Sequence, residues 1–340
     1  MAERVQSLNN IAKTIDTVSS IYLVSFGLIS NVISFIIYKR KVFSKQSIGT
    51  YLSWLSISNL IAVLTLLENL FIKFEWNKTL VYCKFYVYLH YINLQYCSWI
   101  LVVNSFDHLL SVTMAFKYKI KVLKEKYYQI IVLLCILALL CLINIPLLIN
   151  SYYNEEISEC DLYPKYNYML DILDMLVCTL IPFILMTIST AIIIVRLFEW
   201  KNDTRTINRA RSSESSRNKI RKTQFARTVI GINLLFLVCN LPISIILIVM
   251  NYKGSTSSDD KSNSVKTFDE QLANAQLELF YSIFHMLMYS HNASPLIVYL
   301  ICNRLFRQEF YILFCIHNKD NNEAIRGKKQ RKQRLTTNNY

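Results

Sequence analysis

Long stretches without a charged side chain interrupt the polar parts of the chain at intervals. Seven of them are at least 21 residues long and consist mainly of Leu, Ile, Val, Phe, Tyr and Met. They cover residues 17–38, 46–67, 85–106, 127–154, 175–195, 228–252 and 279–303. A helix needs about 20 apolar residues to cross a membrane, and none of the stretches alternates strictly between apolar and polar as a membrane β-strand does. The pattern predicts an all-α membrane protein with seven transmembrane helices.

The distribution of charge predicts the orientation of these helices. The chain has 37 Lys and Arg against 23 Asp and Glu, which gives a net charge of +14. One set of connecting segments carries a net +20, whereas the other set, which includes the N-terminus, carries −6. Basic residues are enriched on the cytoplasmic side of membrane proteins. We therefore expect an extracellular N-terminus and a cytoplasmic C-terminus, on opposite sides as an odd number of spans requires.

The basic run 328–334 could also belong to a nucleic-acid-binding arm. A nucleic-acid-binding protein would lack seven membrane spans, and basic residues at cytoplasmic helix ends are attracted to anionic lipid. We therefore expect membrane lipids, and no nucleic acid, as partners.

Motifs for catalysis are absent from the sequence. It has no glycine-rich phosphate loop, no Cys/His cluster with metal spacing and no intramembrane pair of carboxylates. We expect that the protein is not an enzyme and that it binds no cofactor and no metal. A transporter or channel would show intramembrane charges or internal repeats, and the sequence shows neither, so this class is the less favoured alternative.

Three positions outside the spans suggest covalent modification. Cys83 and Cys160 both fall on the outer side, where the secretory route is oxidising, so a disulfide between them is the natural pairing. Asn77 begins the glycosylation sequon Asn-Lys-Thr on the same side. On the inner side, Cys315 follows the amphipathic segment 303–314 and is a candidate for palmitoylation.

Short motifs then occur in a characteristic order along the spans. They are Ser30-Asn31, residues 55–60, Asp107-His108-Leu109 beginning 24 residues after Cys83, Pro146, Pro182, residues 236–242, residues 294–299 and Phe306-Arg307. Together they resemble the rhodopsin-like (class A) G-protein-coupled receptors. The resemblance implies an extracellular segment 1–16, a receptor domain 17–303, and a cytoplasmic amphipathic helix 8 with a basic tail over 304–340. It also implies location in the plasma membrane and coupling to a heterotrimeric G protein, with arrestin and kinases as further partners.

The resemblance also implies a set of switch and coupling residues. These are Asp107, His108, Leu109, Pro182, Phe236, Asn240, Pro242, Pro295 and Tyr299. A proline inside a helix removes a backbone hydrogen bond and bends it, which provides a hinge. His108 replaces the Arg that contacts the G protein in the family, and Asn240 replaces a Trp. These departures leave open an atypical or non-coupling receptor.

The outer half of the bundle indicates the kind of ligand. His90 stands where amine receptors have Asp, and the last span contains no Lys to hold retinal. Acidic residues of the outer segments favour a cationic peptide, and residues 239–242 resemble those of invertebrate neuropeptide receptors of the FMRFamide type. We expect the ligand to contact Glu68, His90, Tyr91, Gln95, Asp174, Tyr281 and His285. Hydrogen bonding between helices is the alternative role for each of these side chains.

Overall fold

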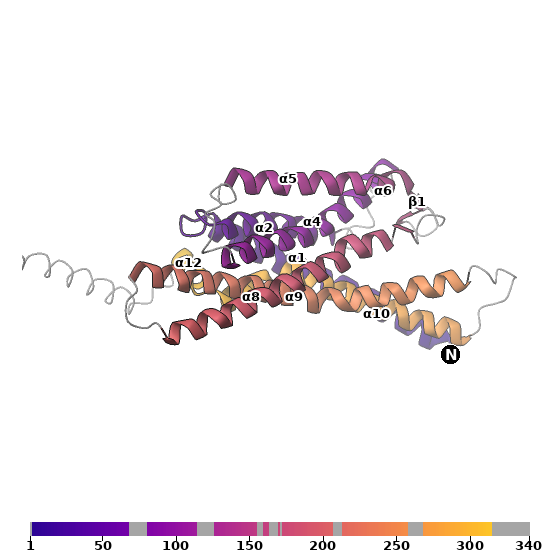
Figure 1. Ribbon diagram of the computed structural model, residues 1–340. Helices are drawn as coiled ribbons and strands as arrows, with labels where there is room; N and C mark the ends of the chain where they lie inside the picture. Colours follow the sequence, from indigo (N-terminus) through magenta and orange to yellow (C-terminus); the bar gives the residue numbers. More distant parts are fainter. Residues whose placement is uncertain are drawn as a thin grey trace, which may run out of the picture.

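The helices of the computed structural model run roughly along one common axis (Figure 1). The structure describes residues 2–67, 80–113, 126–154, 159–162, 169–170, 172–206, 213–257 and 268–314. Its elements are α1 (Ala2–Lys39), α2 (Ser47–Thr65), α4 (Leu80–Thr113), α5 (Lys126–Ile143), α6 (Ile145–Asn150), β1 (Ser151–Asn154), β2 (Glu159–Leu162), η3 (Met175–Leu180), α8 (Ile181–Thr206), α9 (Ser213–Ser257), α10 (Phe268–Ala293), α11 (Pro295–Cys302) and α12 (Arg304–Leu313). The seven predicted spans correspond to α1, α2, α4, α5 with α6, η3 with α8, α9, and α10 with α11. The all-α seven-helix fold class is therefore confirmed.

Five of the described helical segments are long and apolar enough to cross a membrane by length and composition alone. They are Glu3–Lys39, Ser47–Thr65, Lys126–Asn150, Ile172–Glu199 and Arg221–Met250. The third and seventh spans, α4 and α10, fall below this criterion because they are richer in polar side chains, many of them buried against other helices. In a membrane bundle, such side chains act as hydrogen-bonding contacts between helices.

The fourth span ends earlier than the apolar pattern predicts. α5 stops at Ile143, and Pro146 lies at the start of the short helix α6. Residues 151–154 form the strand β1, which pairs antiparallel with β2, so the expectation of one helix through residue 154 is wrong at its outer end. The strand is formed by backbone pairing with a second segment, which a count of apolar residues does not register.

The remaining intramembrane prolines have different effects on their helices. Pro182 lies just after the π-helical turn η3, and Pro295 begins α11 after α10 has ended at Ala293. Pro242 lies inside α9, which continues as one helix from Ser213 to Ser257. The prolines thus coincide with an irregular turn in the fifth span and a break in the seventh. The sixth span continues as one helix through its proline.

α1 and α10 extend past their apolar stretches at the end of the bundle where the N-terminus and β1 also lie (Figure 1). This end is predicted to be extracellular and is called the outer end. Small buried residues, Ala12 on α1 and Ala275 on α10, permit close packing of such helices. Ser282 donates a hydrogen bond of 3.1 Å to the carboxylate of Asp16. The two helices therefore continue together beyond the apolar spans.

An aromatic cluster closes the opposite end of the bundle. The ring of Tyr38 lies 5.0 Å from that of Tyr299 and 5.3 Å from that of Phe306, and all three side chains are fully buried. Phe306 belongs to α12, and an ion pair of 2.8 Å between Arg40 and Glu309 also ties this helix to the segment after α1. The amphipathic helix predicted after the last span is thus present and packed against the bundle.

Candidate functional site

Two ladders of aromatic and imidazole rings face each other in the outer half of the bundle. On α4, the ring of Tyr86 stacks on that of His90 with centroids 5.7 Å apart, and on α10 the ring of Tyr281 stacks on that of His285 at 5.4 Å. Tyr289 joins the ladders, because its hydroxyl lies 3.2 Å from Nε2 of His90 and its ring lies 5.0 Å from that of His285. The third and seventh spans therefore meet through these rings.

A hydrogen-bonded amide cluster lies beside the ladders and joins the third, fourth and fifth spans. Nε2 of Gln95 donates to Oδ1 of Asp174 at 2.8 Å, and Nδ2 of Asn144 donates to Oε1 of Gln95 at 2.6 Å. Gln95 and Asn144 are fully buried, whereas Asp174 is half-buried. The carboxylate of Asp174, immediately before η3, is thus oriented by a buried amide pair.

Most of the predicted ligand residues lie close to one another in this part of the bundle. The ring of Tyr91 also belongs to the group, because it lies 5.8 Å from that of His90. Sequence reasoning missed Tyr289 and Asn144, although these two side chains connect the predicted residues. An Asn within an almost entirely apolar stretch, two residues before Pro146, is the signal that could have identified Asn144.

The outer strand β1 lies over the start of α4. The sulfur of Cys83, which is fully buried, lies 3.0 Å from the carbonyl oxygen of Tyr152. In the β1–β2 register, the Cα of Cys160 pairs with that of Tyr153, the next residue along β1. The two cysteines predicted to form a disulfide therefore belong to adjoining elements of the outer end.

Three predicted positions lie outside the described residues. They are Glu68, a candidate ligand contact, Asn77, the glycosylation candidate, and Cys315, the palmitoylation candidate.

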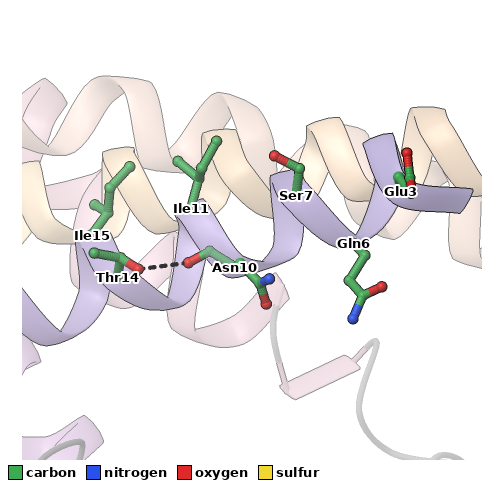
Figure 2. Close-up of a pocket in the computed structure, with 7 residues that line it drawn as sticks. All are labelled: Glu3, Gln6, Ser7, Asn10, Ile11, Thr14 and Ile15. Carbon is green, nitrogen blue, oxygen red and sulfur yellow. Dashed lines mark hydrogen bonds between the residues drawn. The ribbon is translucent and has the colours of Figure 1, made fainter.

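A hollow of about 500 Å³ lies on the outer extension of α1, away from the predicted ligand residues. Figure 2 shows that all the residues lining it come from this one helix. They are Glu3, Gln6, Ser7, Asn10, Ile11, Thr14 and Ile15. The hollow is open to the surroundings and shares no residue with the ring ladders or the amide cluster, so it does not correspond to the expected ligand site.

The middle of the bundle contains the predicted switch residues of the sixth span. Nδ2 of Asn240 donates to the carbonyl oxygen of Phe236 at 2.9 Å and lies 3.2 Å from Nδ1 of His291 on α10. The ring of Phe236 meets that of His291 edge-on at 5.2 Å. Asn240, one turn after Phe236 and two residues before Pro242, thus links the sixth and seventh spans at the position where the family has a Trp.

The end of α4 that is predicted to be cytoplasmic carries the Asp107-His108-Leu109 motif. His108 is only 7% exposed, while Asp107 and Leu109 are half-buried. His108 lies beyond the apolar stretch 85–106, where burial, and to a lesser degree the nearby ammonium of Lys222, lowers its pKa to about 4. Its imidazole is therefore neutral near pH 7, unlike the permanently charged Arg of the family motif.

These features define a seven-helix membrane bundle with polar clusters in its outer, middle and inner parts. The family model described as "7 transmembrane receptor (rhodopsin family)" matches residues 30–299. The chain belongs to this family, the rhodopsin-like G-protein-coupled receptors, and is a multi-pass membrane protein of a receptor family rather than an enzyme family. No match was found among curated proteins.

Proposed function

We propose that the chain is a receptor for an extracellular peptide, most simply a cationic neuropeptide, and that it signals through a heterotrimeric G protein. The observation that carries this proposal is the concentration of polar and aromatic side chains on facing surfaces of α4 and α10 and at the start of the fifth span. Polar side chains are costly inside a membrane and are retained there for contacts between helices or with ligands.

The charge of the ligand is inferred from the outer side of the bundle. The carboxylate of Asp174 is half-buried at this end, and the outer segments carry a net charge of −6. An acidic entrance attracts a cationic partner and disfavours an anionic one. The resemblance of residues 239–242 to FMRFamide-type receptors supports an amidated peptide.

The proposal is tested by expressing the chain with a promiscuous G-protein reporter and applying pools of amidated peptides that contain Arg or Lys. We expect at least one pool to give a signal, and the variant Asp174→Asn to weaken the response by about tenfold or more. Glu278→Gln is the matched control, because Glu278 is an exposed acid on the outer part of α10. No signal from any pool, with surface expression verified, would contradict the proposal.

A second candidate function is a receptor that binds ligand without coupling to a G protein. The neutral, buried His108 favours it, because the family motif has a charged Arg there. The variant His108→Arg distinguishes the candidates: a peptide response that appears only in this variant would indicate that the natural chain binds ligand but does not couple.

We also propose the orientation and the modifications that the charge pattern suggests. The N-terminal segment 1–16 is extracellular, the tail 304–340 is cytoplasmic, and the protein resides in the plasma membrane. Epitope tags at the two ends test this, since only the N-terminal tag should be stained on intact cells. Glycosylation of Asn77, palmitoylation of Cys315 and recruitment of kinases and arrestin belong to the same proposal.

We propose a disulfide between Cys83 and Cys160 that ties the outer hairpin to the top of α4. The contact of the Cys83 sulfur with β1 and the register of β2 support it. Such a bond would hold β1 and β2 over the ring ladders, beside the proposed ligand site.

A further inference from the structure

The contact between α1 and α10 at the outer end contains a carboxyl group. Oδ2 of Asp16 accepts the hydrogen bond from the hydroxyl of Ser282 at 3.1 Å. The second carboxyl oxygen, Oδ1, is buried and has no hydrogen-bond partner. Leaving a buried polar atom unpaired costs free energy, and the cost is larger for an ionised group than for a neutral one. The position therefore favours the protonated form of Asp16.

Charges that could offset an ionised Asp16 are few around this contact. The charged or titratable side chains within about one helical turn of it are Lys13 on α1 and Glu278, Tyr281 and His285 on α10. Lys13 and Glu278 are exposed. The helix α2, which also packs along α1, contains no Asp, Glu, Lys, Arg or His. Neither of the ion pairs found among the described residues involves Asp16, so no cation pairs with it in this part of the chain.

Burial changes the protonation equilibrium of Asp16. It raises the pKa of the carboxyl above its ordinary value, because the charged form loses its water, and the hydrogen bond from Ser282 offsets part of this increase. Asp16 lies just before the apolar stretch 17–38, so the aqueous medium outside the membrane is close to it. Ionising Asp16 while the two helices are together is therefore unfavourable, and separating them restores its contact with water.

The contact is directly connected to the ring ladder on α10. Ser282 lies between Tyr281 and His285 in the sequence, and the rings of these two residues stack with centroids 5.4 Å apart. The ring of His285 also lies 5.0 Å from that of Tyr289. A displacement of this part of α10 relative to α1 therefore also displaces rings of the proposed ligand site.

We propose that Asp16 and Ser282 form a proton-operated clamp between the outer parts of α1 and α10. With Asp16 protonated the two helices stay together, and with Asp16 ionised they separate at this end. The ligand of the clamp is a proton from the extracellular medium, so acidification closes it. The inference goes beyond peptide binding and G-protein signalling, and it rests on the proposed function only for the extracellular placement of residues 1–16.

The pH range of the effect follows from the sign of the pKa difference. In the open form the pKa of Asp16 should be near the ordinary value of about 4, whereas the closed form has the raised pKa. The closed form therefore has its full advantage below about pH 4 and loses it as the pH rises to the pKa of the closed form. Because one proton is linked to closure, the ratio of closed to open molecules should fall by at most about tenfold per pH unit.

The clamp is tested by the distance between two spin labels on the full chain in detergent, measured from about pH 4 upward. The labels are carried by non-canonical amino acids at Gln6 and Asn274, which are exposed positions on the outer parts of α1 and α10. The natural cysteines then stay in place. We expect short distances in acid and a growing population of longer distances as the pH rises. Distances that do not change with pH would overturn the clamp.

Three variants assign the effect to this contact. Asp16→Asn keeps a side chain of similar size that cannot ionise, so its label distances should be short at every pH. Ser282→Ala removes the hydrogen bond that lowers the pKa of Asp16, so the helices should separate only at a higher pH. Glu278→Gln is the matched control, because this exposed acid lies one turn from Ser282, and its distances should follow those of the natural chain.

The remaining outcomes also decide the matter. A pH dependence that persists unchanged in Asp16→Asn would contradict the role of this residue. Longer distances in acid would contradict it as well, because they would indicate a group that becomes charged on protonation, such as His285. If Asp16→Asn does not fold, the shift expected for Ser282→Ala decides. An N-terminal tag that is not stained on intact cells would contradict the proposed orientation without changing the label distances, so the two failures are distinguishable.

Discussion

The start of α2 offers a strict test of packing, because Gly49 approaches backbone rather than a side chain. A methyl group added at Gly49 would lie 2.7 Å from the carbonyl carbon of Phe43 and 3.2 Å from its Cβ. Backbone cannot move aside as the end of a flexible side chain can, and the connection is further held by a hydrogen bond of 2.8 Å from the Gln46 amide to the Phe43 carbonyl. We therefore expect Gly49→Ala to destabilise the protein.

The size of the effect follows from two opposing contributions. Alanine in place of glycine stabilises a helix interior by about 0.5–1 kcal/mol. Overpacking a buried position costs about 1–3 kcal/mol and occasionally more. At Gly49 the cost should lie near the upper end of this range, which leaves a net loss of about 2–2.5 kcal/mol. At Gly231 the nearest atoms are ends of the Val298 and Cys302 side chains, so Gly231→Ala should be close to neutral.

Thermal unfolding of the purified protein in detergent measures this difference. A thiol-reactive dye reports it, because Cys97, Cys178 and Cys239 are buried free cysteines that become accessible on unfolding. We expect the midpoint to fall by several degrees for Gly49→Ala and to change little for Gly231→Ala. A midpoint for Gly49→Ala at or above that of the natural chain would refute the packing at this turn.

Three further predictions concern polar contacts. Asn144→Leu should lower the free energy of unfolding by about 1–3 kcal/mol, because it leaves the buried amide of Gln95 short of a partner. The double variant with Gln95→Leu should lose less stability than the sum of the two single variants, as a double-mutant cycle of unfolding would show. Cys83→Ser and Cys160→Ser should each lower surface expression and the double variant no further, whereas free thiols at both positions in non-reducing peptide mapping would refute the bridge. Glu309→Gln should cost below about 1 kcal/mol, since its partner Arg40 is 33% exposed, and a larger shift in the unfolding midpoint would indicate that the pair has a greater role in anchoring α12.

The number and order of the spans could be predicted from charge-free stretches, because membrane thickness sets the length of an apolar helix. The ends of the helices could not be predicted in this way. Residues 2–16 contain Glu3, Arg4 and Lys13, which end an apolar window but do not prevent a helix. Their helical state is supported by packing against α10, a helix more than 250 residues later in the sequence. Likewise, β1 depends on its pairing with β2, which is a tertiary interaction.

The candidate site shows the same limit. Helical spacing predicted that Tyr281 and His285 would share a face of α10, and their rings do stack. Spacing within one helix does not determine how the neighbouring helix is rotated about its own axis. The packed bundle is therefore needed to show that Tyr289 is the partner of His90 and that Asn144 is the partner of Gln95. Residues within one element were thus predictable, whereas the contacts between elements were not.

The neutral substitutions in the family motifs and the polar contacts of the bundle have a common physical consequence. His108 and Asn240 stand where the resemblance leads one to expect Arg and Trp, and both are almost fully buried. Burying a neutral amide or imidazole costs much less than burying a charge. Breaking one amide contact also costs far less than separating a buried ion pair. The neutral contact of the Asn240 amide with the Phe236 carbonyl should therefore break at a lower free-energy cost than a buried charge pair would, and its strength should depend only weakly on salt.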